Sequence, residues 1–488
     1  MNRIEQFSII ADDLGNILRF ISFGTCVPLI VSVIYQEWDM IIPMSVVPLL
    51  LYLIGTFFLM FPENKREAKL SQALFSVAFI WLICAFVGAL PFWLGTGMPY
   101  LDAVFESMSG WTTTGLTLIP DIDSTPYTLL FWRSFTQWLG GLGIVAFSVV
   151  MLSKTGLNPS RFYRSEGRSE DFMPSVVQQG YQMWKIYLIL TFSFVLLLLL
   201  SGISLWDSVN IVMTAIASGG YSVHSEGISY YNNFLLEMLI IPVMIAGALP
   251  FKIYYMMYYK RKFSLFRDQQ AWLLFFFIIL GFIIIASDLF WFNNLDAATS
   301  LRYGIFMSVS GITSTGFQIS SPNSWAPVTV IFLMLLMFIG GSSGSTAGGI
   351  KLSRVALAWR GIVWWFKRSF LSKNIIIPFH YNGENIPKAD AEREVSKNML
   401  IIILYLLVIF FSVIAIMHLE ALTVDTSNAL FEVVSAICNN GISAGIVTPD
   451  MSPLSKIIFI FVMWIGRLEI LPVIIFFMAF IKGFDKPI

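Results

Sequence analysis

The chain has 488 residues, of which 57% are hydrophobic, 16% are aromatic and only 12% are charged. A soluble chain carries about 25% charged residues, so the composition excludes a soluble fold. Thirty basic residues balance thirty acidic ones, which leaves no excess of positive charge for nucleic acid. The cysteines Cys26, Cys84 and Cys438 are far apart in apolar surroundings, which predicts packing residues and excludes a disulfide scaffold.

Ten apolar stretches have the length of a membrane-spanning helix, which needs about 20 apolar residues. They cover residues 14–35, 41–61, 71–94, 128–153, 184–205, 234–258, 270–291, 325–350, 397–418 and 455–482. The first stretch carries Arg19 and follows a start that contains Glu5 and Asp12, whereas a signal peptide has a basic flank and a shorter apolar core. We therefore expect a retained membrane anchor and nine further spans.

The connections between the stretches differ in charge, and their basic residues predict the orientation of the chain. Residues 351–397 carry nine Lys or Arg residues, and residues 154–185 and 252–267 are also basic. In the alternate connections Arg302 is the one clear basic residue among many Asp and Glu residues. The positive-inside rule places the basic connections and both termini in the cytoplasm. The zero net charge is thus the sum of a basic inner face and an acidic outer face.

Four long outer connections contain one repeated unit. They cover residues 95–127, 206–233, 292–324 and 419–454, and contain the sequences FESMSGWTTTGLT, NIVMTAIASGGYS, FMSVSGITSTGFQ and FEVVSAICNNGIS. These sequences align without gaps on Gly115, Gly220, Gly316 and Gly441. The stretch before each glycine has the apolar spacing of a helix but is too short to cross a bilayer. Residues that can cap a helix N-terminus lie near the predicted starts, at Asp102, Asp207, Thr299 and Ser427.

A short helix that enters the membrane, ends at a glycine and leaves again is a re-entrant pore loop. Unpaired backbone at that depth is tolerated only where it lines a cavity. Four such loops around one axis would offer rings of carbonyl oxygens, which replace the hydration shell of the ion in potassium channels. Glycine is expected because a Cβ would obstruct the required dihedral angles. Ordinary extracellular turns would explain one copy of the motif, whereas four copies favour pore loops.

The order of span, pore loop and span, repeated four times with one glycine per filter segment, resembles the superfamily of K⁺ transporters that includes the Trk, Ktr and HKT proteins. Two extra N-terminal spans point to the TrkH branch. The resemblance covers essentially the whole chain. It implies an all-α polytopic membrane protein with four helix–pore loop–helix units around a pseudo-fourfold axis, plus two N-terminal transmembrane helices. The predicted boundaries are 1–69 for those two helices and 70–160, 161–262, 263–385 and 386–488 for the four units.

The resemblance also implies which residues form a K⁺ filter. They are Thr113, Thr114, Gly115, Leu116, Ser218, Gly219, Gly220, Tyr221, Ser314, Thr315, Gly316, Phe317, Asn439, Asn440, Gly441 and Ile442. In the plant branch of the superfamily, a Ser at the first filter glycine accompanies a preference for Na⁺. The glycine at position 115 therefore favours K⁺.

The eighth stretch contains five glycines in the sequence IGGSSGSTAGGIK, at residues 339–351. Each glycine lowers helix stability by about 1 kcal/mol relative to alanine, so the helix should unwind there. The resemblance implies an intramembrane gate formed by Gly340, Gly341, Gly344, Ser345, Thr346, Gly348 and Gly349. A helix-packing surface of small residues is the alternative. Similarities to a P-loop and to the GxSxG motif of hydrolases lack the preceding strand that both motifs require.

Arg467 lies within the last stretch, where a charged side chain costs at least about 2.5 kcal/mol unless it faces the protein interior or a water-filled path. An ion pair with Glu469 is a structural alternative, although residues i and i+2 of a helix do not face each other. The resemblance implies that Arg467 projects below the filter next to the gate and forms a barrier to cations. We expect Arg133 and Arg302 to have structural roles, by pairing with Asp residues or by neutralising helix carbonyls.

These features predict selective uptake of K⁺ and Rb⁺ across the inner membrane of a bacterium, by a protein that is not an enzyme and uses no organic cofactor. The resemblance implies a homodimer and a cytosolic regulatory subunit of the TrkA type that binds NAD and ATP. One alternative is a Na⁺-permeable, or a Na⁺- or H⁺-coupled, member of the same superfamily. Other classes are an intramembrane hydrolase that uses Ser342 and a secondary transporter with an inverted repeat. No nucleic-acid partner is expected.

Overall fold

The computed structural model describes residues 3–61, 70–143, 176–261, 265, 268–370, 378–381, 384–420 and 425–482. These residues are mostly helical, which confirms the predicted all-α membrane architecture. Six helical segments within the described residues are long and apolar enough to cross a membrane, and two bent pairs of helices qualify if each pair is one span. The predicted unit boundaries at 160/161 and 262/263 lie outside the described residues.

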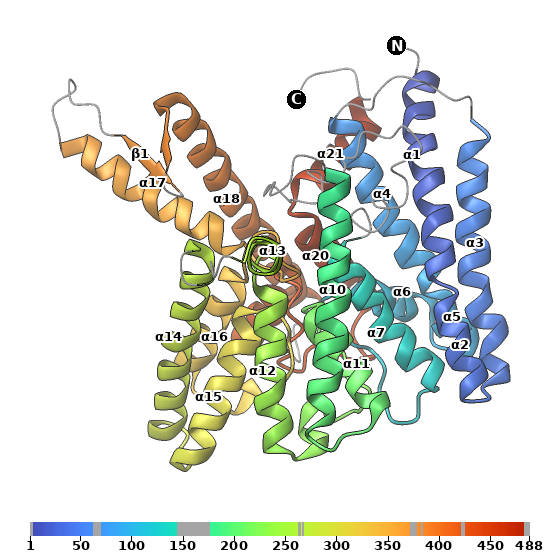
Figure 1. Cartoon of the computed structure of the whole chain (residues 1–488), viewed down its shortest axis with the longest axis horizontal. Helices are drawn as coiled ribbons and strands as arrows, with labels where there is room; N and C mark the ends of the chain where they lie inside the picture. Colours follow the sequence, from blue (N-terminus) through green and yellow to red (C-terminus); the bar gives the residue numbers. More distant parts are fainter. Residues whose placement is uncertain are drawn as a thin grey trace.

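The N-terminal helices form two neighbouring spans at one edge of the molecule (Figure 1). The first span is made of α1 (Arg3–Gly24) and α2 (Val27–Ile34), and the second of η1 (Trp38–Met40) and α3 (Ile41–Leu59). Gly15 of α1 and Gly55 of α3 face each other so closely that a Cβ on either would lie within 2.8 Å of the other's carbonyl oxygen. Small residues at a helix crossing allow this close backbone approach in membranes.

The first two repeated units share one order of elements. Unit 1 contains α4 (Leu70–Gly88), α5 (Leu90–Thr96), α6 (Tyr100–Trp111) and α7 (Tyr127–Leu142). Unit 2 contains α10 (Val176–Leu199), α11 (Leu205–Ile216), η2 (Gly227–Tyr231), α12 (Phe234–Ala248) and α13 (Phe251–Tyr259). In each unit a long helix is followed by a short helix and then by a second apolar helix.

Units 3 and 4 repeat this order. Unit 3 contains α14 (Gln269–Trp291), α15 (Ala297–Ile312), η3 (Pro322–Ser324), α16 (Pro327–Ile339) and α17 (Leu352–Phe370). An antiparallel hairpin of β1 (Phe379–Tyr381) and β2 (Glu384–Ile386) follows, with Phe379 opposite Ile386. Unit 4 contains α18 (Lys388–Leu419), α19 (Thr426–Ile437), α20 (Pro453–Leu468) and α21 (Leu471–Lys482). In Figure 1, α17, the hairpin and the start of α18 project beyond the helical bundle.

The four short helices α6, α11, α15 and α19 begin slightly earlier than the sequence predicted. The N-cap side chains are Ser204 for α11, Asp296 for α15 and Asp425 for α19, whereas α6 begins after Pro99 without a side-chain cap. The predicted caps Asp207, Thr299 and Ser427 lie inside the first turn, where their backbone N–H groups donate to these true caps. The predicted cap Asp102 forms an ion pair with Lys456.

The second apolar helix is interrupted in units 2, 3 and 4. The predictions of a continuous span over residues 234–258 and over residues 455–482 are wrong, whereas the break within residues 325–350 was predicted from its glycines. Residues 234–258 are bent by 95° between α12 and α13, and residues 455–482 are bent by 113° between α20 and α21. Pro250 explains the first bend, because proline forces the preceding residue out of the helical region. In the predicted span 325–350, α16 ends at Ile339. In the predicted span 128–153, α7 ends at Leu142, and the residues from 144 onward lie outside the described part of the chain.

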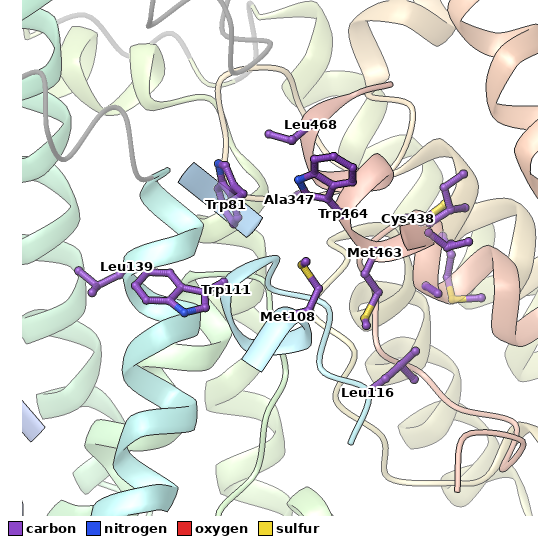
Figure 2. Packing of buried hydrophobic residues seen from close by; sticks show 14 of the residues in the cluster. Trp81, Met108, Trp111, Leu116, Leu139, Ala347, Cys438, Met463, Trp464 and Leu468 are labelled. Carbon is purple, nitrogen blue, oxygen red and sulfur yellow. The ribbon is translucent and has the colours of Figure 1, made fainter. Parts of the chain in front are cut away.

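Close packing places the second helices against the ends of the short helices. A Cβ added at Gly140, Gly247 or Gly466 would lie below 3.0 Å from the carbonyl oxygen of the last residue of α6, α11 or α19, a distance that real Cβ atoms essentially never show. The surrounding core joins α4, α6, α7, α19 and α20 through buried aromatic and Met side chains (Figure 2). Cys84 and Cys438 are buried as predicted, but Cys26 is exposed at the break between α1 and α2.

Candidate functional site

The chain has the same backbone conformation after each of the four short helices. We call residues 113–116, 218–221, 314–317 and 439–442 the ring segments. Each begins with a residue in the left-handed region, with φ between 49° and 55°, and each has a glycine of positive φ two residues later. In every segment the N–H group of the residue before that glycine donates to the carbonyl five residues back, at 2.9–3.1 Å. The repeat found in the sequence is therefore also a repeat of local structure.

Neighbouring ring segments approach each other at their glycines. A Cβ on Gly115 would lie below 3.0 Å from the carbonyl oxygen of Gly219 in the next segment. The same relation continues in order, from Gly220 to Thr315, from Gly316 to Asn440 and from Gly441 to Thr114. The fourth segment thus returns to the first, and the four backbones close a ring. Only glycine allows both this contact and the positive φ without strain.

Polar side chains behind the ring hold its backbone, and they differ between units. The Oγ atoms of Ser109 and Ser435 accept hydrogen bonds from the N–H groups of the glycines in units 1 and 4, at 3.0 and 3.1 Å. In unit 3 the Oγ atom of Ser310 donates to the carbonyl of Phe317 at 2.7 Å. In unit 2 Gln137 replaces the serine: its Nε2 donates to Gly219 O at 2.7 Å, and its Oε1 accepts from Tyr221 N at 3.1 Å.

The hydrophobic residues that follow the ring glycines turn their side chains into the core. Leu116, Tyr221, Phe317 and Ile442 are all at most 2% exposed. The hydroxyl of Tyr221 donates to the carbonyl of Glu106 at 2.8 Å. Of these four predicted site residues, therefore, only the backbone faces the ring.

A cavity of about 250 Å³ lies on one side of the ring, which we call the outer side after the orientation that the sequence predicts, and is bordered by all four ring glycines. Arg133, His224 and Glu226 also line it. Nδ1 of His224 lies 2.8 Å from Oδ1 of Asp123, and this hydrogen bond from His224 lowers the pKa of the Asp123 carboxyl below its usual value. This contact joins the outer loops of units 1 and 2, so the side chains around the cavity are held in place by contacts between units.

A buried ion pair supports the ring from behind in unit 1. The Nε atom of Arg133 donates to Oε1 of Glu106 at 2.8 Å, and both side chains are at most 1% exposed. Arg133 also donates to Ser222 O at 2.7 Å and lies over the ring of Tyr221, 4.1 Å from its centroid. Glu106 accepts from the backbone N–H of Leu118 at 3.0 Å. The expected structural role of Arg133 is thus found, with a Glu partner where Asp was predicted.

Related contacts occur in two other units. Glu432, which aligns with Glu106, accepts from Ser443 Oγ at 2.6 Å and from the N–H of Ala444 at 2.7 Å. Arg302 forms its ion pair with Glu237 of α12, so it too pairs with a Glu residue. The carboxylates of Glu106 and Glu432 thus hold the chain just beyond the ring glycines in units 1 and 4.

On the opposite side of the ring, called the inner side after the same prediction, residues 340–351 form a non-helical loop between α16 and α17, as the glycine content predicted. We call it the intramembrane loop. Its central residue is Thr346, whose N–H donates to Gly247 O at 3.1 Å. The Oγ1 atom of Thr346 donates to Ile216 O at 2.8 Å and lies 2.9 Å from the Oγ atom of Ser218, the first residue of a ring segment. The intramembrane loop is therefore bonded directly to the ring.

Further contacts hold the intramembrane loop in the bend of α12–α13 and against unit 4. The N–H of Phe251 donates to Gly344 O, and the N–H of Gly349 donates to Cys438 O, both at 3.0 Å. Figure 2 shows Ala347 of this loop between the indole rings of Trp81 and Trp464 in that view. Bonds to units 2 and 4 thus replace part of the helical backbone bonding that is lost at residues 340–351.

Arg467 lies at the C-terminal end of α20 and joins the ring to the intramembrane loop. Its Nη1 atom donates to Thr113 Oγ1 at 3.3 Å and to Thr346 O at 3.1 Å. Its Nη2 atom donates to Gly141 O at 3.0 Å and also to Gly140 O. One guanidinium group therefore contacts a ring segment, the loop and the end of α7.

The residues after Arg467 explain why α20 stops there. Glu469 and Ile470 both adopt positive φ, at 60° and 68°. Glu469 forms its ion pair with Arg354 of α17. The side chain proposed as an alternative partner of Arg467 thus ties the α20–α21 bend to the end of the intramembrane loop.

Sequence reasoning missed two features of this site. The role of Gln137 had no signal, because this residue belongs to unit 1 and serves unit 2. The bends had a signal in the prolines Pro250 and Pro472, each within a long apolar stretch. Ser342, the nucleophile of the hydrolase alternative, has a buried hydroxyl without a hydrogen-bond partner among the described residues, so nothing there activates it.

The fold and the ring together define a polytopic membrane protein in which four re-entrant segments of one chain meet. The sequence matches the TrkH family, described as cation transport protein, over residues 50–482. The chain belongs to the TrkH family of cation transport proteins, and it is a transport protein and not an enzyme.

Individual relatives extend over nearly the whole chain. An uncharacterised cation transporter of Methanocaldococcus jannaschii is 34% identical, over 95% of this chain and 94% of that protein. The Trk system potassium uptake protein TrkH of Salmonella typhimurium is 30% identical, over 85% of this chain and 86% of that protein. The crystal structure of the potassium transporter TrkH from Vibrio parahaemolyticus has a TM-score of 0.84 at 24% identity, and the match covers 96% of this chain and 98% of that one. This last likeness shows the fold.

The buried pair of Arg133 and Glu106 predicts a non-additive effect on stability. Arg133→Met leaves Glu106 buried without its partner and should lower the free energy of unfolding by about 3–5 kcal/mol. Arg133→Met combined with Glu106→Gln should recover much of this loss. The measurement is the unfolding transition of purified protein in detergent. Arg368→Met is the control, because its pair with Glu392 is largely exposed and should contribute at most about 1 kcal/mol. Equal losses in Arg133→Met and the control would contradict the assigned support.

Proposed function

We propose that this protein takes up K⁺, and Rb⁺ as its close analogue, through the opening enclosed by the ring segments. The observation that carries the proposal is the closed ring, in which each glycine lies against the carbonyl of the next segment. Convergent carbonyl oxygens can replace the hydration shell of K⁺. Relatives that match most of the chain are named potassium uptake proteins, which supports this choice of ion.

The proposed filter residues are those of the ring segments, and their roles differ by atom. Backbone carbonyls would bind the ion, since the side chains at 116, 221, 317 and 442 are buried in the core. Asp and Glu residues in the outer loops would raise the local concentration of cations at the entrance. Ions would then pass from the outer cavity through the ring toward the intramembrane loop.

The proposed gate consists of the intramembrane loop and Arg467. The bonds of Thr346 to Ser218, Ile216 and Gly247 hold the loop against the inner side of the ring. A positive charge at Arg467, in contact with Thr113, would repel a cation that leaves the ring. Opening would then require the loop to release its hydrogen bonds, each with a net contribution of about 0.5–1.5 kcal/mol.

The proposed setting is an inner membrane with both termini in the cytoplasm. The beginning of α1 and the end of α21 lie at the same end of the bundle, as this orientation requires (Figure 1). A homodimer and a cytosolic nucleotide-binding subunit of the TrkA type complete the proposal. The projecting helix α17 offers a surface for such partners, because its side chains Trp359, Trp365 and Phe370 are exposed next to basic residues.

Growth of a strain that lacks K⁺ uptake tests the function. Expression of this chain should restore growth at low K⁺ and uptake of radioactive Rb⁺, and co-expression of the cognate regulatory subunit should change the rate. Absence of growth in both conditions, with the protein inserted in the membrane, would contradict K⁺ uptake. Preferential uptake of Na⁺ would instead favour the Na⁺-permeable alternative.

Gly115→Ser tests the role of the ring in selectivity. The new Cβ would collide with Gly219 O and distort one quarter of the ring, so K⁺ over Na⁺ selectivity should fall by roughly tenfold, or about 1.4 kcal/mol. The measurement is competition of K⁺ and Na⁺ in the uptake assay. Gly97→Ser is a matched control, since Gly97 also has positive φ, at 71°, but has no atom within 4 Å of its Cβ position. Unaltered selectivity in Gly115→Ser would count against the filter assignment.

Arg467→Gln tests the barrier. Glutamine keeps a hydrogen-bond donor but removes the charge, so Rb⁺ flux should rise by about tenfold, which corresponds to about 1.4 kcal/mol. Arg19→Gln is the control, because Arg19 of the peripheral helix α1 contacts Tyr52 of α3. Flux in vesicles at equal protein content is the readout. Unchanged or lower flux in properly inserted Arg467→Gln protein would remove Arg467 from the gate.

A further inference from the structure

A second cavity lies away from the ring, between α4, α6 and the α20–α21 bend. Its volume is about 380 Å³. Its walls include Leu82 of α4, Val104 of α6, Trp464 of α20 and Phe476 of α21. The lining side chains are apolar apart from two polar groups: the hydroxyl of Tyr100, which donates to Phe86 O at 3.1 Å, and the buried indole N–H of Trp464, which has no hydrogen-bond partner among the described residues. A buried water needs two to four polar partners, so this one N–H group would not retain water in the cavity.

The cavity is open toward the surroundings of the helical bundle. Phe86, Phe461 and Phe477 at its border are 47%, 40% and 46% exposed, whereas Val104 and Trp464 in its floor are at most 2% exposed. The border residues belong to apolar membrane helices, and the medium next to such helices is hydrocarbon. An apolar cavity of roughly 150 Å³ already takes up benzene, so this larger one can hold a long hydrocarbon.

We infer that the acyl chain of a bilayer phospholipid occupies this cavity, which we call the acyl pocket. The occupant is a lipid because the pocket is apolar and meets the bilayer at its open side. Filling it gains contacts for the aromatic side chains of its wall, which otherwise lack neighbours on one side. The acyl pocket is separate from the path proposed for K⁺.

Aromatic side chains in the wall of the acyl pocket also pack α20 against α21 at their bend. The rings of Trp464 and Phe476 lie 5.4 Å apart at 89°, and those of Phe461 and Phe477 lie 6.4 Å apart. Arg467 follows Trp464 by one helical turn, and its Cζ atom lies 5.6 Å from the ring centroid of Trp81 on α4. An acyl chain between α4 and the bend would therefore stabilise the arrangement that holds Arg467 against the ring. An effect of the bound acyl chain on K⁺ flux would follow, and this effect rests on the proposed function. Occupancy of the acyl pocket does not depend on the proposed function.

Photolabelling tests occupancy directly. The full chain is reconstituted in vesicles of phosphatidylcholine that contains a photoreactive acyl chain, and the labelled peptides are mapped. Label should concentrate on the residues that line the acyl pocket. Leu82→Trp and Ile460→Trp, which fill it from two different helices, should each lower that label by about tenfold. Ile279→Trp is the control, because Ile279 of α14 is 57% exposed on another face.

Two outcomes would overturn the inference. One is label in the acyl pocket no stronger than label around Ile279, and the other is label that both filling variants leave unchanged. Cross-links from the acyl pocket to a second copy of the chain would identify a protein occupant and would also overturn it. The flux arm is separate: if the wild-type protein takes up no K⁺, the labelling result still decides occupancy. If it does take up K⁺, both filling variants should change Rb⁺ flux and Ile279→Trp should not.

Discussion

The structure depends on bringing four stretches of irregular backbone into contact inside a membrane. Peptide groups at that depth must find partners within the protein or face a polar opening. The chain meets this constraint by repetition. Each short helix is followed by a left-handed residue and, two positions later, by a glycine of positive φ, and each ring glycine allows the carbonyl of the next segment to approach. Glycines at 140, 247 and 466 then allow the second helices to approach the same ends. A Cβ at a ring glycine would force neighbouring units apart, and a Cβ at 140, 247 or 466 would force apart two helices of one unit.

Charged groups buried around the ring resist such separation. The pair of Arg133 and Glu106 joins unit 1 to the backbone of unit 2, and the pair of Lys456 and Asp102, at 2.6 Å, joins unit 4 to unit 1. Buried ion pairs add little net stability compared with apolar packing, yet the loss of one partner is costly. Their effect is to penalise every arrangement in which the units are not in register. These ion pairs therefore fix the relative positions of the units more than they stabilise the fold.

The repeated ring segments and the glycine-rich loop were predicted from the sequence, whereas the bends of the helices and the contacts between units were missed. The ring glycines were found because four ungapped copies stand out against unrelated loops, and the intramembrane loop was found because five glycines weaken a helix. The bends at Pro250 and after Arg467 were missed because hydropathy measures how apolar a stretch is and not where its axis points. Caps were placed within one turn of the true caps, since Asp, Ser and Thr occur at several nearby positions. Contacts between units, such as that of Gln137 with Gly219, leave no local pattern at all.

The supports of the ring have an evolutionary consequence. In a ring built from four identical subunits, every substitution appears four times. Here one polypeptide contains all four quarters of the ring, and different side chains hydrogen-bond to their backbones. These side chains are Ser109, Gln137, Ser310 and Ser435. A mutation alters one quarter and leaves three intact, so its effect on the opening is graded. Such a chain can adjust the size and polarity of its opening in small steps that a homotetramer cannot take.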